Sequence, residues 1–260
     1  MKVKVVPKKV FTLDDVGSEE KSHQICIVLR DVPGALAKAA KVLANANINV
    51  KTSSTFYLAE YPNAGVWSSF VDVSRAKKSV DEIADELRRT GVVLEVFTLE
   101  PKPTPFESLH FPILHGNTRA IIMPIGMFWA LWSGFFRILH HSGLAAVLYP
   151  AGKKTGEYAA MRLKEMFNIE GEELLKALEQ CVQATGWGIV NVQHVNFKQA
   201  TATITVKDCF EAAAWRRKPY PVCHWTRGYF AGFMGTVFAK PVEAVEVKCM
   251  ERGRTLRIPN

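Results

Sequence analysis

The chain has 260 residues, of which 48% are apolar and 22% charged. This length accommodates two domains with cores of their own, and this composition is that of a globular protein. The formal charge of +8 comes from dispersed basic residues without a helix-turn-helix, zinc-finger or RNA-binding pattern, so we expect a solvated basic surface and no nucleic-acid partner.

Targeting and membrane signals are not evident. The first ten residues alternate lysine with valine, and the five cysteines are widely spaced. Neither pattern is that of a secreted, disulfide-bonded protein, so we expect a cytoplasmic one. The longest uncharged run, Ala120–Phe136, has 17 residues, fewer than the roughly 20 that span a bilayer, and Pro124 and Gly126 interrupt it. We expect a buried strand and helix there and no membrane contact.

The first domain is predicted over residues 22–100, after a lead-in of residues 1–21. Apolar periodicity gives four strands and two helices, and Ser79-Val80-Asp81-Glu82 is a capping box that opens the second helix. The order is β-α-β-β-α-β, a ferredoxin-like fold. The main elements are strand 25–30, helix 34–46, a β-rich run from 48, strand 66–73, a helix from 79 to 91 and strand 92–99.

Three prolines in residues 101–105 predict a stiff linker and a domain boundary. The second domain, residues 106–260, is predicted to be α+β. We expect strands at 119–125, 187–195, 201–206, 242–248 and 255–258, and helices at 127–141, 155–167, 172–185 and 225–238.

The stretch Asp31-Val32-Pro33-Gly34-Ala35-Leu36 joins a strand to a helix through a Pro-Gly turn. Free backbone N–H groups at such a helix start favour a carboxylate or another anion. With Asn47-Ile48-Asn49-Val50 entering the next strand, residues 22–100 resemble an ACT domain, the amino-acid-sensing module of many metabolic enzymes.

The ACT resemblance implies dimers that pair their sheets and an amino acid or related metabolite in the interface. The expected effector-binding residues are Asp31, Pro33, Gly34, Ala35, Leu36, Asn47 and Asn49. The alternative is an ACT fold that pairs subunits and binds nothing.

Glycines at 228, 232 and 235 lie within the predicted helix 225–238. Each interior glycine costs about 1 kcal/mol against alanine, so we expect this helix to pack closely on another element or a ligand. Gly152 and Gly156 repeat the four-residue spacing.

This helix, Cys223 and the segment Val-Glu-Val-Lys-Cys-Met-Glu-Arg-Gly around Cys249 resemble the 4-vinyl-reductase family, whose fold is shared with vesicle-tethering TRAPP subunits. The resemblance covers residues 106–260. It implies binding of a hydrophobic or aromatic small molecule. The expected lining residues are His110, Trp129, Trp132, Phe136, His140, Trp225, Tyr229 and Phe233. The alternative is a plain aromatic core.

Metal-binding members of this family hold zinc with four residues, and Cys223, Glu246 and Cys249 match three of them. Arg257 stands at the fourth position and cannot be a ligand, although His224 could replace it. We favour buried thiols with an Arg257–Glu246 ion pair, and zinc stays the alternative.

Dinucleotide, phosphate-loop and nucleophile-elbow motifs are missing from the sequence, which favours binding over catalysis. We predict a homodimeric sensor whose output passes through a partner protein. The alternatives are a reductase for a vinyl-bearing or tetrapyrrole substrate, and a structural interaction module.

Overall fold

The computed structural model describes residues 21–100, 109–116, 118–215, 222–250 and 253–258, the side chains of 248–250 and 253–257 excepted. The chain forms two compact units, residues 1–121 and 122–260.

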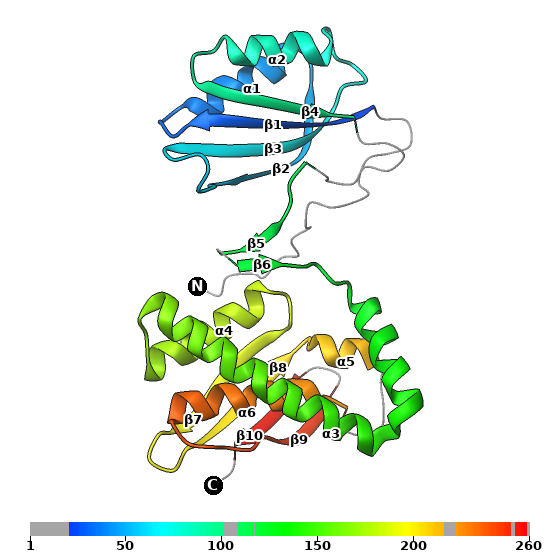
Figure 1. Ribbon diagram of the computed structural model, residues 1–260, viewed down its shortest axis with the longest axis vertical. Coiled ribbons are helices and arrows are strands. Elements are labelled where there is room, and N and C mark those ends of the chain that lie inside the picture. The colour runs from blue at the N-terminus through cyan, green and yellow to red at the C-terminus, as the bar shows by residue number, and fades with distance from the viewer. Residues whose placement is uncertain (1–20, 101–108, 117, 216–221, 251–252, 259–260) are drawn as a thin grey trace. The chain divides into compact units, whose positions relative to one another are not determined.

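The first unit has the predicted order of elements: β1 (Ser22–Arg30), α1 (Ala35–Asn45), β2 (Asn49–Phe56), β3 (Ala64–Asp72), α2 (Val80–Arg88) and β4 (Val93–Leu99). The strands form one antiparallel sheet in the order β2-β3-β1-β4. Both helices lie on the same face of this sheet (Figure 1). The ferredoxin-like prediction is confirmed.

Strand β1 is buried on both faces. Ile25, Ile27 and Leu29 pack beneath the helices, whereas Cys26 and Val28 point to the opposite face. The predicted capping box is present, because the Glu82 N–H donates to Ser79 Oγ (3.3 Å) and the Ser79 N–H donates to the Glu82 carboxylate (2.8 Å). Local sequence signals therefore set where α2 begins.

The segment after the linker differs from its prediction. Residues 101–108 lie outside the described part, and the chain then forms a short hairpin of β5 (Ile113–His115) and β6 (Thr118–Ala120). The predicted strand at 119–125 was too long, because Pro124 stands directly before a helix that begins at Ile125. Among the described residues, every helix is too short or too polar to cross a membrane.

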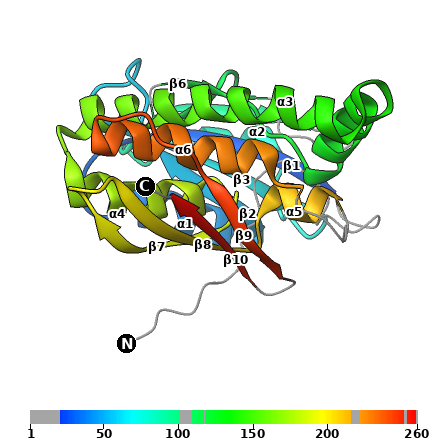
Figure 2. The ribbon, with the colours of Figure 1, turned by 90° about the horizontal axis from the view of Figure 1, so that it is seen from below.

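The second unit contains α3 (Ile125–Phe167), α4 (Gly171–Ala184), β7 (Ile189–Asn196), β8 (Thr201–Lys207), α5 (Phe210–Trp215), α6 (His224–Phe238), β9 (Val245–Met250) and β10 (Gly253–Ile258). Its antiparallel sheet has the order β7-β8-β10-β9. Helix α6 runs alongside α3 (Figure 2). The two predicted hairpins are confirmed, and α5 is an element that the sequence analysis did not predict.

Helix α3 replaces the two helices predicted at 127–141 and 155–167. It is interrupted at His140, whose backbone is left-handed and extended (φ 53°, ψ −170°). We call Ile125–Leu139 the first arm and His141–Phe167 the second arm. Pro150 lies inside the second arm, although a proline removes one helical hydrogen bond. The loss is tolerated because the arm is anchored in the core through Leu144 and Leu148.

Four glycines let α3 and α6 touch backbone to backbone. A Cβ on Gly152 or Gly156 would lie 2.1 Å from the Trp225 oxygen or 1.9 Å from the Tyr229 oxygen. On α6, a Cβ on Gly228 or Gly232 would lie 2.0 Å from the Tyr149 oxygen or 1.9 Å from the Lys153 oxygen. The expected close packing is confirmed for these glycines. The third predicted position, Gly235, faces Lys240 and Val242 instead.

Candidate functional site

The turn before α1 presents backbone and carboxylate groups to solvent. Gly34 has a left-handed conformation (φ 83°), and no side chain caps the helix start. The Asp31 N–H donates to the Asn63 oxygen (3.0 Å) and the Val32 N–H to the Arg30 oxygen (2.9 Å), which fixes the turn. Asp31, Pro33, Gly34 and Leu36 are exposed, whereas Ala35 is buried against the sheet. The first-turn N–H groups of α1 can therefore meet an anion.

The two predicted asparagines do not join this turn. Asn47 and Asn49 follow the C-terminal end of α1, whereas the turn precedes its start. The Asn47 side-chain amide donates to the Arg75 oxygen (2.9 Å). The structure instead places Tyr57 beside the turn, with its hydroxyl 3.4 Å from Asp31 Oδ1. Nothing in the local sequence pattern singles out Tyr57.

His110 was expected as a polar anchor in the second domain, and the structure places it in the first unit. Its Nε2 lies 3.3 Å from Cys26 Sγ, and its ring meets Phe56 edge-on at 5.2 Å. The correction has a physical cause. The sheet face that carries Cys26 and Val28 is apolar, and Leu109, next to His110, packs on it.

The predicted aromatic residues of the second unit divide into separate groups. Trp132 stacks on Trp215 (centroids 6.4 Å apart), whereas Trp225 stacks on Tyr229 (5.5 Å). Phe233 is fully buried in the core. Trp129 and His140 are exposed, which does not fit a role in lining an apolar pocket.

Two small cavities lie among these groups. The histidine cavity is lined by Phe136, His141, Leu144, Trp215, Val222 and His224. The tryptophan cavity is lined by Val182, Trp187, Val206, Phe210, Trp225, Thr226, Tyr229 and Phe230. Each has a volume of about 10 Å³, room for about one water molecule. Of the predicted pocket residues, Phe136 lines the first cavity, and Trp225 and Tyr229 line the second.

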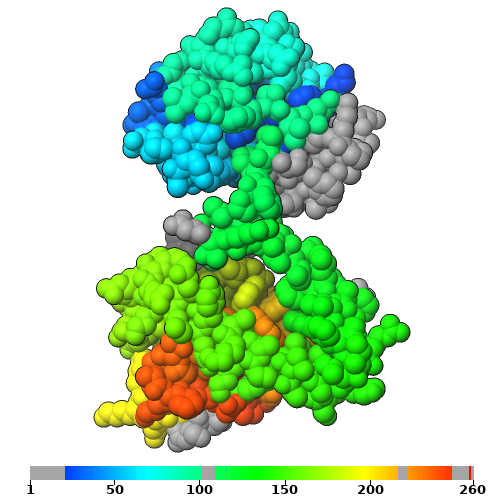
Figure 3. All heavy atoms as spheres, in the orientation of Figure 1, coloured from blue at the N-terminus to red at the C-terminus, as the bar shows by residue number. Residues whose placement is uncertain are grey.

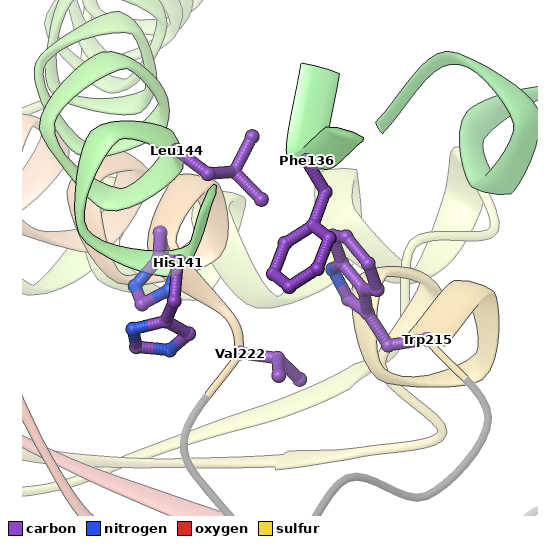
Figure 4. A pocket seen from close by; sticks show the side chains of 6 residues that line it. Phe136, His141, Leu144, Trp215 and Val222 are labelled. Atoms are coloured by element: carbon purple, nitrogen blue, oxygen red, sulfur yellow. The ribbon is translucent and has the colours of Figure 1, made fainter. Parts of the chain in front are cut away.

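The histidine cavity combines apolar walls with buried polar atoms. Phe136 and Trp215 lie side by side, with His141 and Leu144 across from them (Figure 4). Within the described part of the chain, Trp215 Nε1 and His224 Nε2 are buried without a hydrogen-bond partner. Such groups are unusual, because a buried polar atom normally finds a partner.

The His224 imidazole is neutral at pH 7. Burial, helped by Arg227 and His141, lowers the pKa of His224 to about 4. Its ring lies edge-on to that of His141, with centroids 5.1 Å apart. A neutral imidazole has one nitrogen that accepts a hydrogen bond, so this cavity offers both a donor, the indole N–H, and an acceptor. The sequence analysis had considered His224 only as a substitute zinc ligand, and Trp215 not at all.

A second buried polar cluster lies at the start of α6. The Glu211 carboxylate, fully buried, accepts hydrogen bonds from the backbone N–H groups of Trp225 (3.1 Å) and Thr226 (2.7 Å). Burial raises the pKa of Glu211 to about 8, with Cys209 adding to the rise and Thr226 opposing it. Glu211 therefore caps α6 from a neighbouring element.

The zinc prediction is not tested. Cys223 is buried and Glu246 half-buried, but the side chains of Cys249 and Arg257 lie outside the described ones. The side chains that the structure does describe include no group of three or more His, Cys, Asp or Glu able to hold a metal ion. Zinc stays a prediction that metal analysis of the protein and of Cys249→Ser can test.

The family model of the 4-vinyl-reductase domain matches residues 202–256. This stretch runs from β8 to β10 and contains Trp215, Cys223 and His224. The second unit therefore carries a 4-vinyl-reductase domain, as the sequence resemblance indicated.

Other proteins resemble parts of the chain. An uncharacterized protein of Methanocaldococcus jannaschii is 24% identical over 137 residues, which are 53% of this chain and 74% of that protein. The structure of the phenol-responsive sensory domain of the transcription activator PoxR with phenol is 19% identical, with a TM-score of 0.49, and the match covers 55% of this chain and 78% of that one.

An ACT domain is also among the similar structures. The ACT domain from the GTP pyrophosphokinase of Chlorobium tepidum is 18% identical, with a TM-score of 0.26, over 31% of this chain and 99% of that one. The order β-α-β-β-α-β and the sheet order β2-β3-β1-β4 give the first unit its ACT-like fold.

Proposed function

We propose that this protein is a ligand-responsive sensor whose second unit binds a small aromatic molecule bearing a hydroxyl group. The observation that carries the proposal is the pair of buried polar atoms, Trp215 Nε1 and His224 Nε2, in a cavity with otherwise apolar walls. Ligand sites typically combine such walls with a few placed polar groups.

A phenolic hydroxyl matches both atoms at once. It accepts a hydrogen bond from the indole N–H of Trp215 and donates one to the neutral imidazole of His224. A hydrocarbon ring of the same size would leave both buried groups unsatisfied, at about 1–3 kcal/mol each. The site should therefore prefer phenol to benzene.

An aromatic ring requires the cavity to open, because the closed cavity holds only a water-sized molecule. The two walls that must separate come from different elements. Phe136 belongs to the first arm of α3, and Trp215 to α5. Binding would thus move one element relative to another, which is what a sensor needs.

Phenol and benzene make a matched pair of ligands for the test. Phenol should raise the Tm of the protein and benzene should have less effect. Trp215→Phe keeps an aromatic ring but removes the N–H, so it should weaken phenol binding about tenfold, since a lost hydrogen bond contributes about 1–1.5 kcal/mol.

Trp129→Phe is the control for this substitution, because Trp129 is 48% exposed and does not line the cavity. Equal binding of benzene and phenol would contradict the proposal. So would equal phenol affinity of Trp215→Phe and Trp129→Phe.

We further propose that the first unit binds a metabolite with a carboxylate group, such as an amino acid, at the turn before α1. The open N–H groups of that helix start would hold the carboxylate, and Asp31 would face an ammonium group. The turn is exposed on its outer side, which favours a site completed by a second copy of the chain.

A thermal-shift screen over amino acids tests this second site. An amino acid that raises Tm for the wild type should raise it much less for Asp31→Asn. Glu60→Gln, which neutralises another exposed carboxylate, is the control and should respond like the wild type. A flat response to all amino acids would leave the first unit as a pairing module.

A further inference from the structure

Two thiols meet inside the second unit. Cys209 Sγ lies 3.8 Å from Cys223 Sγ, and both residues are at most 3% exposed. Cys209 directly precedes α5, and Cys223 is the N-cap of α6. The contact therefore joins the beginnings of two helices that are separated by 14 positions in the chain.

The backbone on both sides of the thiols is held in place. The Phe210 N–H donates to the Trp187 oxygen (2.9 Å), the Ala213 N–H to the Cys209 oxygen (3.0 Å), and the Arg227 N–H to the Cys223 oxygen (3.0 Å). A disulfide needs its sulfur atoms at about 2.05 Å, so they must approach by about 1.8 Å. Rotation about the two Cα–Cβ bonds supplies a movement of that size.

We propose that Cys209 and Cys223 form a reversible disulfide when the protein meets a peroxide. Hydrogen peroxide oxidises one thiol to a sulfenic acid as its O–O bond breaks, and one water leaves. The second thiol attacks this sulfur, the S–S bond forms and a second water leaves. Two electrons pass from the sulfur atoms to the peroxide, so the step needs no further reactant.

The histidine cavity offers the approach for the oxidant. Val222 and His224, the chain neighbours of Cys223 on either side, both line it. The cavity accepts a water-sized molecule, and hydrogen peroxide is the oxidant closest to that size. The same contact gives the disulfide a consequence. It would close a loop that carries Trp215 and Val222, two residues of the cavity wall.

Peptide mapping tests the disulfide on the full chain. Trypsin separates the two cysteines onto residues 208–216 and 218–227. After peroxide treatment and alkylation, these peptides should appear linked, lighter by two hydrogens than the reduced pair, and dithiothreitol should release them. Closing this loop should also raise the Tm of the second unit by about 5 °C or more.

Internal and matched controls make the result decisive. Oxidation of Met161, which is 53% exposed, shows that the peroxide acted. Cys209→Ser should abolish the linkage, and Cys181→Ser should leave it intact. Full alkylation of both cysteines after Met161 is oxidised would overturn the proposal, as would a bond from either of them to a different cysteine.

The consequence for the cavity rests on the proposed function, whereas the disulfide does not. Phenol titration of the reduced and oxidised protein should give affinities that differ at least threefold. Equal affinities would overturn the consequence alone. Failure of phenol to bind either form would overturn the proposed ligand, and the peptide map would still decide the disulfide.

Discussion

At the scale of single residues, the start of α6 depends on a carboxylate from another element. The Glu211 side chain accepts from two backbone N–H groups that have no acceptor within their own helix. Because the site is fully buried, water cannot take over this role. The position of α6, and with it Cys223 and His224, is thus set by one side chain.

Glu211→Ala should lower the free energy of unfolding of the second unit by about 2–4 kcal/mol, because it leaves two buried N–H groups without acceptors. Urea denaturation followed by tryptophan fluorescence measures this loss. Glu165→Ala, which removes an exposed carboxylate from α3, should change stability by less than about 0.5 kcal/mol. Similar losses in the two variants would contradict the capping role.

His224 should make the stability of the second unit depend on pH. Its pKa in the folded state is about 4, below the value near 6.5 in the unfolded chain. Between pH 6.5 and 4 the unfolded state therefore binds more protons, and this stability falls as pH falls. The full effect is about 3 kcal/mol, present above pH 6.5 and lost by pH 4.

The wild type and His224→Asn are compared at each pH, so that the opposite contribution of Glu211 cancels. Glu211, with its raised pKa, loses stability as pH rises from about 4.5 to 8. The stability difference between wild type and His224→Asn should shrink as pH falls from 6.5 to 4. His194→Asn, an exposed site, should show no such trend. A constant difference for His224→Asn would show that burial does not shift this imidazole.

At the scale of elements, the crossing of α3 and α6 has no side chains between the two backbones. Cβ atoms at the four contact glycines would fall 1.9–2.1 Å from backbone oxygens of the other helix. Backbone atoms cannot rotate away as a side chain can, so the helices would have to separate.

Gly232→Ala should destabilise the second unit by about 3 kcal/mol or more, although alanine is the better helix former. Gly134→Ala is the matched control, because it lies in the first arm of α3 with no atom within 4 Å of a new Cβ. That substitution should stabilise by up to about 1 kcal/mol. Destabilisation of both variants to the same extent would refute the backbone contact.

Local signals allowed the first unit to be predicted from sequence. The Pro-Gly turn, the apolar periodicity and the capping box at Ser79 act within a few residues of one another, so each predicts its element alone. The α6 glycines were equally informative, because their helical penalty demands a close neighbour.

Tertiary packing limited the rest of the prediction. Pro150 locally favours a helix end, yet contacts through Leu148 and Gly152 carry the helix past it. The histidine cavity combines residues from α3, α5 and α6, and no spacing in the chain brings Trp215 together with His141. Its lining could not be predicted without the fold.

At the scale of the whole molecule, the first arm of α3 leaves apolar side chains uncovered. Met127, Leu131, Phe135 and Ile138 are 39–76% exposed and fall on one side of the helix. The arm lies at the surface of the second unit (Figure 3, green). An apolar stripe of this kind favours association, and we propose a second copy of the chain as its partner.

Ile138→Asp should shift the protein from dimer to monomer, because the new charge would be buried without a partner. Sedimentation velocity or light scattering over a range of concentrations measures this shift. Ser142→Asp adds the same charge at an exposed site beyond the break in α3 and should leave the dimer intact. A wild type that is monomeric at all concentrations would contradict the proposed dimer.

The break at His140 makes the first arm of α3 a lever. The second arm is pinned to α6 by the glycine contact, so His140 is the fulcrum. Phe136 stands on one side of it, and His141 and Leu144 on the other. A ring that enters the cavity would thus push next to the pivot. Since Ile125 is about four times as far from His140 along the helix as Phe136 is, a small displacement at the cavity would be amplified about fourfold at the tip.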